Sequence, residues 1–259
     1  MDSVKNSNLP EKPFFQYVVH QLQALSSQCM DHFSNYCVLC QAPVRGRKLC
    51  HSCTLAIKKA PLSCSQCAEP ITDSNYSTHS SYTCGRCQKQ SPHFNRVITG
   101  GLYLTPLSEL LQQFKFQQRI QLTHVLGHIL LNSIQQLVSY SLPEAIIAVP
   151  LHTKRLRQRG YNQAQLIAGF LSRKLNIPLI RQGIYRDKIT EEQTRLTLSE
   201  RKKNLKGAFR IETELPQHIA IVDDVITTGS TTDELAKELI QHHVTNVDVW
   251  CIAKTPQMK

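Results

Sequence analysis

Short apolar runs and stretches of helical spacing alternate over the C-terminal two thirds of the 259-residue chain. The apolar runs predict buried strands at 97–104, 144–150, 177–180, 208–211, 219–222 and 246–253. Apolar residues spaced by three and four predict helices at 106–116, 122–138, 163–175, 199–205 and 232–241. Strands that alternate with helices are typical of an α/β fold with a doubly wound, mostly parallel sheet. Ligands of such sheets bind beyond the carboxyl ends of the strands, so the loops there are candidate sites.

The first third of the chain is built differently, because cysteines rather than apolar runs dominate it. A tail and a helix with apolar spacing over 14–30 come first, within residues 1–36. Four Cys-x-x-Cys pairs follow: Cys37/Cys40, Cys50/Cys53, Cys64/Cys67 and Cys84/Cys87. Two such pairs complete a tetrahedral site of four thiolates, so the spacing predicts two structural Zn²⁺ ions with no open position for water. We therefore expect a small zinc-ribbon domain over 37–95 and the α/β domain over 96–259.

The cysteine pattern leaves two questions open. Sequential sites need the shortest loops, whereas an interleaved cross-brace would join the first pair to the third. A disulfide framework and a redox dithiol are the rival interpretations. We expect a cytoplasmic protein, in which thiols stay reduced, because the chain shows no secretory signal. No apolar run approaches the ~20 residues of a membrane span, so we expect no membrane insertion.

The segment 219–231 carries the most specific chemistry. A short apolar run ends in two adjacent carboxylates, Asp223 and Asp224, which we call the acidic pair. The hydroxyl turn follows: Thr227, Thr228, Gly229, Ser230 and Thr231. Amides at a helix start, with hydroxyl donors beside them, favour a phosphate, whereas the acidic pair should face a ribose diol, Mg²⁺ or both. The segment therefore predicts a site for a phosphorylated ribose. An ordinary Ser/Thr helix cap would account for only one of these hydroxyls.

Basic residues gather after the strand predicted at 144–150. The expected loop 151–163 carries four of them: Lys154, Arg155, Arg157 and Arg159. Arginine forks suit phosphate groups, and a nucleic-acid contact or a solvated surface loop are the alternatives. The formal charge of the chain is +11. It falls to about +7 if eight thiolates hold two Zn²⁺, which is still suited to phosphate-rich partners.

The segment from Val222 to Thr231 closely resembles the phosphoribosyl pyrophosphate (PRPP) loop of type I phosphoribosyltransferases. The cysteine pairs, His-x3-Leu-x3-Gly-Tyr-Asn-Gln at 152–163 and Gln-x2-Leu-x4-Arg-x2-Asn-x3-Ala-Phe at 193–209 extend the likeness. Together they resemble the ComF family from about residue 37 to residue 256. This resemblance implies a cytoplasmic bacterial protein that carries zinc knuckles before a phosphoribosyltransferase domain and supports DNA uptake in natural competence.

The resemblance also implies roles for individual residues. The acidic pair would be the catalytic carboxylates at the ribose diol, and the hydroxyl turn would hold the 5′-phosphate. The basic segment 154–159 would bind pyrophosphate together with Mg²⁺, and Arg195, Arg201 and Lys202 would close over it. Phe114-Lys115-Phe116 could belong to an acceptor hood, although we favour an ordinary helix end.

Two functions of different class follow from these observations. In the first, the protein is a phosphoribosyltransferase that acts on an unidentified nitrogenous acceptor. In the second, it is a non-catalytic accessory protein that binds single-stranded DNA, meets DNA-uptake proteins, and uses the same fold for PRPP or DNA. The basic residues and zinc knuckles favour the second function, and the intact acidic pair and hydroxyl turn favour PRPP binding under both.

Overall fold

The computed structural model describes residues 36–46, 48–71, 82–188 and 205–257. The chain divides into two compact units, which part between Thr54 and Leu55. The helix predicted over 14–30 and most of the helix predicted over 199–205 lie outside the described residues. The domain boundaries expected at 36/37 and 95/96 stay predictions. The third and fourth cysteine pairs lie in the larger unit, together with the sheet.

The smaller unit contains a tight turn at its first cysteine pair. Cys37 N–H donates to the Ala42 carbonyl at 2.7 Å, and Tyr36 and Pro43 form a short antiparallel bridge. Gln41 N–H returns to the Cys37 carbonyl, and a positive φ of 60° at Gln41 closes the turn. The second pair begins the short helix α2 (His51–Ala56).

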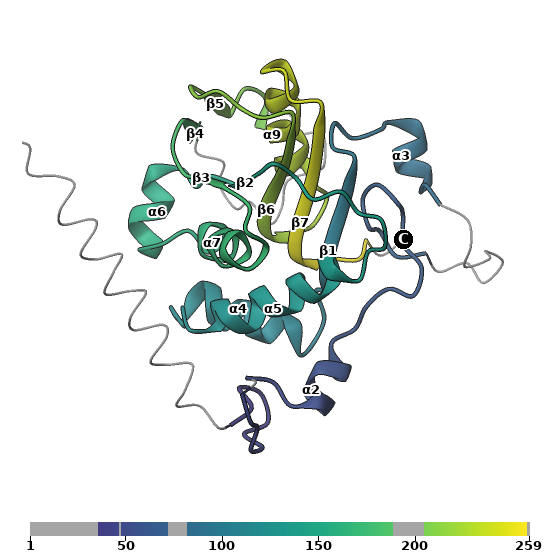
Figure 1. Ribbon diagram of the computed structural model, residues 1–259, viewed down its shortest axis with the longest axis vertical. Helices are drawn as coiled ribbons and strands as arrows, with labels where there is room; N and C mark the ends of the chain where they lie inside the picture. The colour runs from purple at the N-terminus through teal and green to yellow at the C-terminus, as the bar shows by residue number, and fades with distance from the viewer. Residues whose placement is uncertain (1–35, 47, 72–81, 189–204, 258–259) are drawn as a thin grey trace, which may run out of the picture. The chain divides into compact units, whose positions relative to one another are not determined.

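Five parallel strands form the centre of the larger unit (Figure 1), in the order β1-β7-β6-β2-β3. Their bounds are β1 (Arg96–Leu102), β2 (Ala145–Ala148), β3 (Leu179–Ile180), β6 (His218–Ile226) and β7 (Asn246–Lys254). The central strands read as near-continuous apolar runs because helices cover both of their faces. This arrangement confirms the predicted α/β class with a mostly parallel sheet.

Side chains of β6 alternate between the two faces of the sheet. Ile219 and Ile221 pack with Leu235 and Leu239 of α9 (Ser230–Gln241) in one apolar core. The alternate residues of the strand turn to the opposite face. There α5 (Leu122–Gln135) packs on β1 and α7 (Gln163–Leu175) packs on β2 and β6, with the two helices side by side. Helix α4 (Leu107–Phe116) packs against α5.

Close packing explains the glycine pair that interrupts the first strand. A Cβ atom added at Gly100 would lie 2.8 Å from the Ile252 carbonyl oxygen and 2.9 Å from the Cγ2 of Ile129. Any larger side chain there would separate α5 from β1 and β7. The glycine therefore lets the helix approach the strand, which is one of the two uses of glycine inside strands.

Several elements differ from those predicted. The expected loop 151–163 contains a helix, α6 (Thr153–Arg159), capped by the His152 side chain and ended by Gly160 at φ 78°. The run predicted as a strand over 219–222 continues as β6 to Ile226, and α9 begins at Ser230 rather than near residue 232. The structure also adds a strand that the pattern did not predict, β4 (Ile184–Arg186), paired antiparallel with β5 (Phe209–Ile211). A short helix, α3 (Gly85–Lys89), begins at the fourth cysteine pair.

Candidate functional site

The acidic pair lies within the last residues of β6, at the carboxyl end of the sheet. Each carboxylate accepts the amide of the residue that follows it: Asp224 N–H donates to Asp223 Oδ1, and Val225 N–H donates to Asp224 Oδ1, both at 2.8 Å. These bonds fix both carboxylates against the backbone. Strand β7 runs beside the acidic pair, with Asp223 opposite Cys251, whereas β2 ends at Ala148 opposite Val222.

Asp224 of the acidic pair is buried, with only 9% of its surface exposed. Lys115 Nζ lies 3.4 Å from Asp224 Oδ2 and supplies a counter-charge from the end of α4. Asp223 keeps some exposure, yet burial and then the Asp224 carboxylate raise its pKa to about 7. The site therefore holds two adjacent carboxylates, one of which is paired with Lys115.

The hydroxyl turn links β6 to α9. Gly229 adopts a φ of 81°, and its carbonyl accepts the Thr232 hydroxyl at 2.9 Å. The Thr228 hydroxyl lies 2.8 Å from the Ser230 hydroxyl and accepts Ser230 N–H at 3.3 Å. The turn thus gathers hydroxyl groups at the first residues of a twelve-residue helix. Such a helix start offers amide and hydroxyl donors to an anion.

The basic residues predicted after the second strand belong to α6. Strands β2 and β6 are neighbours, with Ala148 beside Val222, and Val149 N–H donates to the Val222 carbonyl at 2.9 Å. The chain that leads to α6 therefore leaves the sheet directly beside the acidic pair. Lys154 and Arg157 on this helix are exposed. Arg195, Arg201 and Lys202 lie outside the described residues.

Two cations near the acidic pair come from elements outside α6. Lys115, which we interpreted as part of a helix end, forms the ion pair with Asp224. Arg186 comes from the unpredicted strand β4. Burial and the neighbouring Arg155 lower the pKa of Arg186, and the charge of Asp223 opposes that shift. Arg186 is thus close enough for electrostatic interaction with both Arg155 of the basic helix and Asp223 of the acidic pair.

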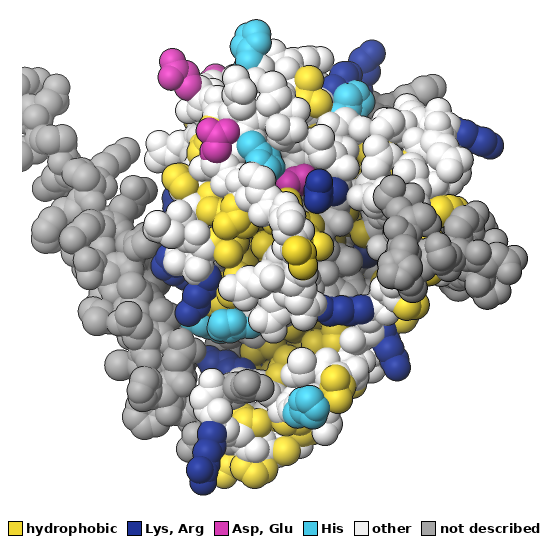
Figure 2. All heavy atoms as spheres, turned by 45° about the vertical axis from the view of Figure 1, so that its right-hand side comes forward, with side chains coloured by type: hydrophobic (Ala, Val, Ile, Leu, Met, Phe, Trp, Pro, Cys, Tyr) yellow, Lys and Arg dark blue, Asp and Glu magenta, His cyan; other side chains and the backbone are white. Residues whose placement is uncertain are grey.

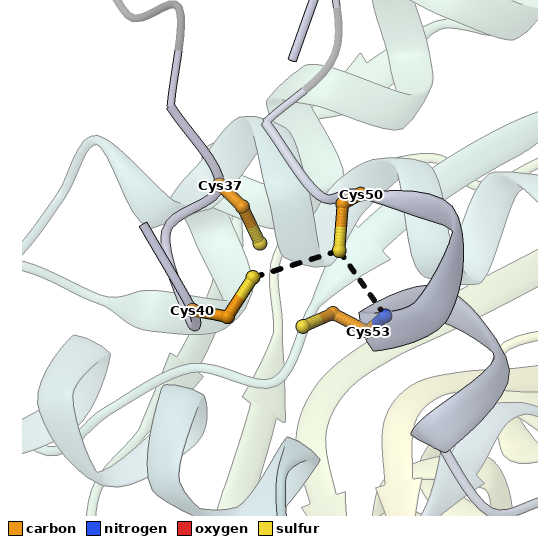
Figure 3. A group of neighbouring side chains, drawn as sticks. All are labelled: Cys37, Cys40, Cys50 and Cys53. Atoms are coloured by element: carbon orange, nitrogen blue, oxygen red, sulfur yellow. Dashed lines mark hydrogen bonds between the residues drawn. The ribbon is translucent and has the colours of Figure 1, made fainter. Parts of the chain in front are cut away.

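The eight paired cysteines form two separate groups. The first cysteine cluster is Cys37, Cys40, Cys50 and Cys53, and the second cysteine cluster is Cys64, Cys67, Cys84 and Cys87. Within each cluster the sulfur atoms lie within 4.8 Å of one another. Figure 3 shows the four side chains of the first cluster turned toward a common centre, with Cys40 Sγ 3.6 Å from Cys50 Sγ. This grouping agrees with sequential sites and not with a cross-brace.

The geometry and chemistry of these clusters fit zinc. Sulfur atoms 2.3 Å from a tetrahedral Zn²⁺ would lie about 3.8 Å apart, close to the 3.6 Å between Cys67 and Cys84. The described cysteines are free thiols, so no disulfide joins them. A hydrogen bond from Cys67 lowers the pKa of Cys64 to about 4, and the same contact raises the pKa of Cys67. Without a cation the cluster resists full ionisation, and a bound Zn²⁺ would relieve that repulsion.

Comparison with known proteins finds relatives along most of the chain. Competence protein F of Haemophilus influenzae is 38% identical over 234 residues, which cover 87% of this chain and 99% of that protein. DNA utilization protein YhgH of Escherichia coli (strain K12) is 36% identical over 225 residues, which cover 85% of this chain and 96% of that protein. The chain belongs to the ComF family.

A more distant member of the ComF family shares a shorter region. Competence protein ComFC of Bacillus subtilis is 26% identical over 204 residues, which cover 75% of this chain and 78% of that protein. No family model matches the chain. The resemblance to the ComF family that the motifs indicated is therefore confirmed by relatives along the chain.

The face of this ComF-family protein that is drawn in Figure 2 does not by itself mark an interface. On the face drawn in Figure 2, Lys and Arg side chains are spread among apolar and polar groups. Among the described helices, none combines the length and the apolar character needed to cross a membrane. The edge of the sheet where the acidic pair, the hydroxyl turn and α6 meet is therefore the candidate site that chemistry singles out.

Proposed function

We propose that this protein binds PRPP at the carboxyl edge of β2 and β6 and acts as a phosphoribosyltransferase-like protein in the bacterial use of external DNA. Relatives named competence protein F and DNA utilization protein support the biological role. The resemblance of the segment 222–231 to a PRPP loop supports the ligand. The protein would act in the cytoplasm, where the cysteine clusters stay reduced.

One observation carries the ligand proposal: neighbouring parallel strands deliver complementary chemistry to one edge. Strand β6 ends in the acidic pair and the hydroxyl turn, and β2 leads into the basic helix α6. A ribose carrying a 5′-phosphate and a pyrophosphate needs donors, a diol-binding acceptor and cations within a small space. In the proposed arrangement the hydroxyl turn holds the 5′-phosphate and the acidic pair holds the diol. Pyrophosphate would lie toward α6: Lys154, Arg155, Arg157 and Arg159.

Catalysis at such a site would depend on positioning and charge. As pyrophosphate leaves, the ribose gains positive charge, which the acidic pair would stabilise from a fixed position. Mg²⁺ bound with PRPP would be held near the acidic pair and would offset the negative charge of the pyrophosphate. The α6 cations would stabilise the leaving group, and Lys115 would balance Asp224 before the ligand arrives. No side-chain nucleophile is needed in this scheme.

A metal ion is proposed for each of the two cysteine clusters. The two cysteine clusters can bind zinc, and we propose that each holds one structural Zn²⁺. All four positions of each site would be filled by thiolates, so neither ion would be open to substrate or water. Both ions would therefore support the structure and take no part in the transfer step.

Calorimetry with PRPP, with and without Mg²⁺, tests the ligand proposal. Thr228→Val combined with Ser230→Ala removes two hydroxyls of the turn and should weaken PRPP binding about 10-fold to 100-fold, because hydrogen bonds to charged groups are lost. Thr245→Val is the control, since Thr245 donates to the Gln217 carbonyl at the opposite end of the sheet. Equal affinities of both variants would contradict the placement of the phosphate.

A second function is favoured by the exposed cations of α6. Charged residues on an exposed helix can neutralise the phosphates of single-stranded DNA as well as those of pyrophosphate. If DNA binds there, its affinity should fall steeply with salt, and PRPP should compete with it. Titration of PRPP into a preformed complex with labelled single-stranded DNA separates the two cases: displacement supports one shared site, and unchanged binding places DNA elsewhere.

A further inference from the structure

We propose that Lys254 and Glu69 are positioning residues of the hydroxyl turn, through which the second cysteine cluster fixes the candidate phosphate site. This inference rests on the proposed function, because it concerns the same turn. It goes beyond that function, since it gives the second cluster a role in ligand binding. Neither residue stood out in the sequence, where Lys254 ends an apolar strand and Glu69 follows a cysteine pair.

Lys254 is the last residue of β7, and its side chain is fully buried. Its ammonium group makes three contacts: 2.7 Å to Glu69 Oε2, 3.0 Å to the Thr227 carbonyl and 2.6 Å to the Thr255 carbonyl. An ammonium group has three protons to donate, so these contacts use them all. A buried charge is tolerated only with such partners. Lys254 thus ties the first residue of the hydroxyl turn to Glu69.

Glu69 belongs to the turn of the third cysteine pair. Cys64 N–H donates to the Glu69 carbonyl at 2.9 Å, and Ser63 and Pro70 form a short antiparallel bridge around it. Its carboxylate is used twice, since Oε1 accepts Gln257 N–H at 2.6 Å while Oε2 contacts Lys254. The backbone of Glu69 is therefore held by the second cluster, and its side chain reaches the end of the sheet.

The segment after the second cluster supports the same turn from another side. His93 N–H and Nδ1 lie 2.7 Å and 3.0 Å from Asp233 Oδ1, in the first turn of α9. Phe94 is 4% exposed, and its ring edge would lie 3.7 Å from a Cβ atom at Gly229. The chain after the fourth cysteine pair thus lies against Gly229 of the turn and against the first turn of α9.

These contacts predict that the cluster and the ligand site are coupled. If the second cluster opens, Glu69 is released and the buried Lys254 charge loses its carboxylate partner. The ammonium would then seek other partners and disturb the Thr227 carbonyl that it holds. By linkage, a ligand bound on the turn would in return stabilise the closed cluster.

Two variants test this relay, by which we mean the contacts that lead from the second cysteine cluster through Glu69 and Lys254 to the hydroxyl turn. Lys254→Met keeps the length of the side chain and removes the charge, and Glu69→Gln keeps the shape of its partner. We expect each to weaken PRPP binding by about tenfold, a size typical of residues that couple two sites. Zinc content should stay at the parent value, and hydrogen exchange of the amides of residues 227–230 should become faster. The Glu69 variant carries the test if the Lys254 variant does not fold.

Two controls separate positioning from general instability. Lys59→Met removes a lysine of the same unit whose ammonium bonds Ser133 and Gln136, away from the hydroxyl turn. Leu130→Ala lowers stability from a fully buried position on α5. Both should keep the parent affinity and the parent exchange rate at the turn when they are measured below their unfolding temperatures.

The outcomes distinguish this inference from the proposed function. If the parent binds PRPP and the relay variants bind it equally well with unchanged exchange, the relay is wrong. If the parent binds no PRPP, the proposed function fails, and faster exchange at residues 227–230 in the relay variants alone still supports the relay. Weakened binding in Leu130→Ala as well would show that the loss reflects instability and would overturn the inference.

Discussion

The first cysteine cluster belongs to the smaller unit and leaves Cys40 exposed, whereas the second lies in the larger unit with three of its four cysteines buried. Their turns are otherwise alike. The N–H groups of Gln41 and Ala68 each donate a hydrogen bond of 3.0 Å to the carbonyl of the first cysteine of their pair. Both residues adopt positive φ. The surroundings of these two residues differ, since Gln41 is exposed whereas Ala68 packs in the apolar core beneath α9.

Cysteine spacing therefore determines the backbone of the turn but not which other part of the molecule the turn supports. Four thiolates at Cys-x-x-Cys spacing produce the same local backbone in both clusters. The neighbouring residues decide whether the cluster stabilises only its own segment or also supports a site. Ala68 and Glu69 give the second cluster its contacts with the apolar core and with Lys254.

Removing one ligand from each cluster gives the largest expected difference. Cys67→Ser should lower the unfolding midpoint of the larger unit by about 10 °C or more and weaken PRPP binding, because a structural zinc site contributes folding energy directly. Cys40→Ser should unfold the smaller unit and leave the larger unit and its ligand affinity close to the parent values. Differential scanning calorimetry and titration with PRPP measure both effects.

Metal analysis makes this comparison quantitative. The untagged parent should hold two Zn²⁺ per chain, and each variant should hold one. A parent with one zinc or none would overturn the assignment of two sites. Equal loss of PRPP affinity in both variants would show that the two clusters do not differ in their effect on the ligand site.

The acidic pair tests the ligand site without touching either cluster. Asp223→Asn combined with Asp224→Asn should weaken PRPP binding by about 30-fold or more, because the carboxylates proposed to hold the ribose diol are replaced and Lys115 loses its partner. Zinc content should stay at two per chain, which separates this loss from that of Cys67→Ser. Unchanged affinity would show that the ribose lies elsewhere.

The stability of the parent has a defined pH dependence, which the single variant Asp223→Asn should remove. The pKa of Asp223 is raised from 3.8 to about 7, so the folded protein keeps a proton that the unfolded chain has already lost. The free energy of unfolding of the parent should therefore fall as pH rises through this window, by up to ~1.4 kcal/mol per pH unit. The Asn variant should lack this slope. Denaturant unfolding between pH 6 and pH 8, where zinc stays bound, measures the upper part of the window.

The basic helix α6 belongs to the proposed ligand site but takes no part in the relay. Replacing its four cations with Gln should reduce PRPP affinity by about tenfold to a hundredfold, since charge-assisted contacts to phosphate are lost. The unfolding midpoint should change little because none of the four residues is buried, and Lys154 and Arg157 are exposed. If single-stranded DNA binding persists in this variant at the parent level, its surface lies elsewhere. Basic residues close in sequence to the first two cysteine pairs are then the next candidates: Arg45, Arg47, Lys48, Lys58 and Lys59.

Local patterns were sufficient for the fold class and for the two cysteine clusters. Apolar runs located the central strands, and cysteine spacing located both clusters, because in each case neighbouring residues carry the signal. The short strand β4 escaped prediction because only three residues form it and Tyr185 within it is exposed. Helix α6 escaped because its cations suggested a solvated loop, whereas Gly160 and His152 cap a regular helix.

Residues that act through distant contacts could not be predicted from local sequence. The partner of Asp224 is Lys115, 109 positions earlier, and the partner of Lys254 is Glu69, 185 positions earlier. Periodicity identifies which face a residue takes but not which side chain it meets across the fold. A lysine at the end of an apolar strand is the one signal that could have drawn attention to Lys254, since buried lysines require a partner.

The smallest expected effect comes from paired histidine variants, one near each cluster. His93→Ala removes the ring contact with Asp233 and keeps the amide bond, so PRPP affinity should fall only about twofold to threefold, as expected for a partly exposed pair. His51→Ala changes an exposed residue inside the first cluster and should leave affinity at the parent value. Asp233→Asn, which keeps an oxygen for the His93 amide, should behave like His93→Ala. Titration of all three variants with PRPP in one buffer would confirm the comparison if only His93→Ala and Asp233→Asn weaken binding. If His51→Ala weakened binding equally, the support of the ligand site would not be specific to the second cluster.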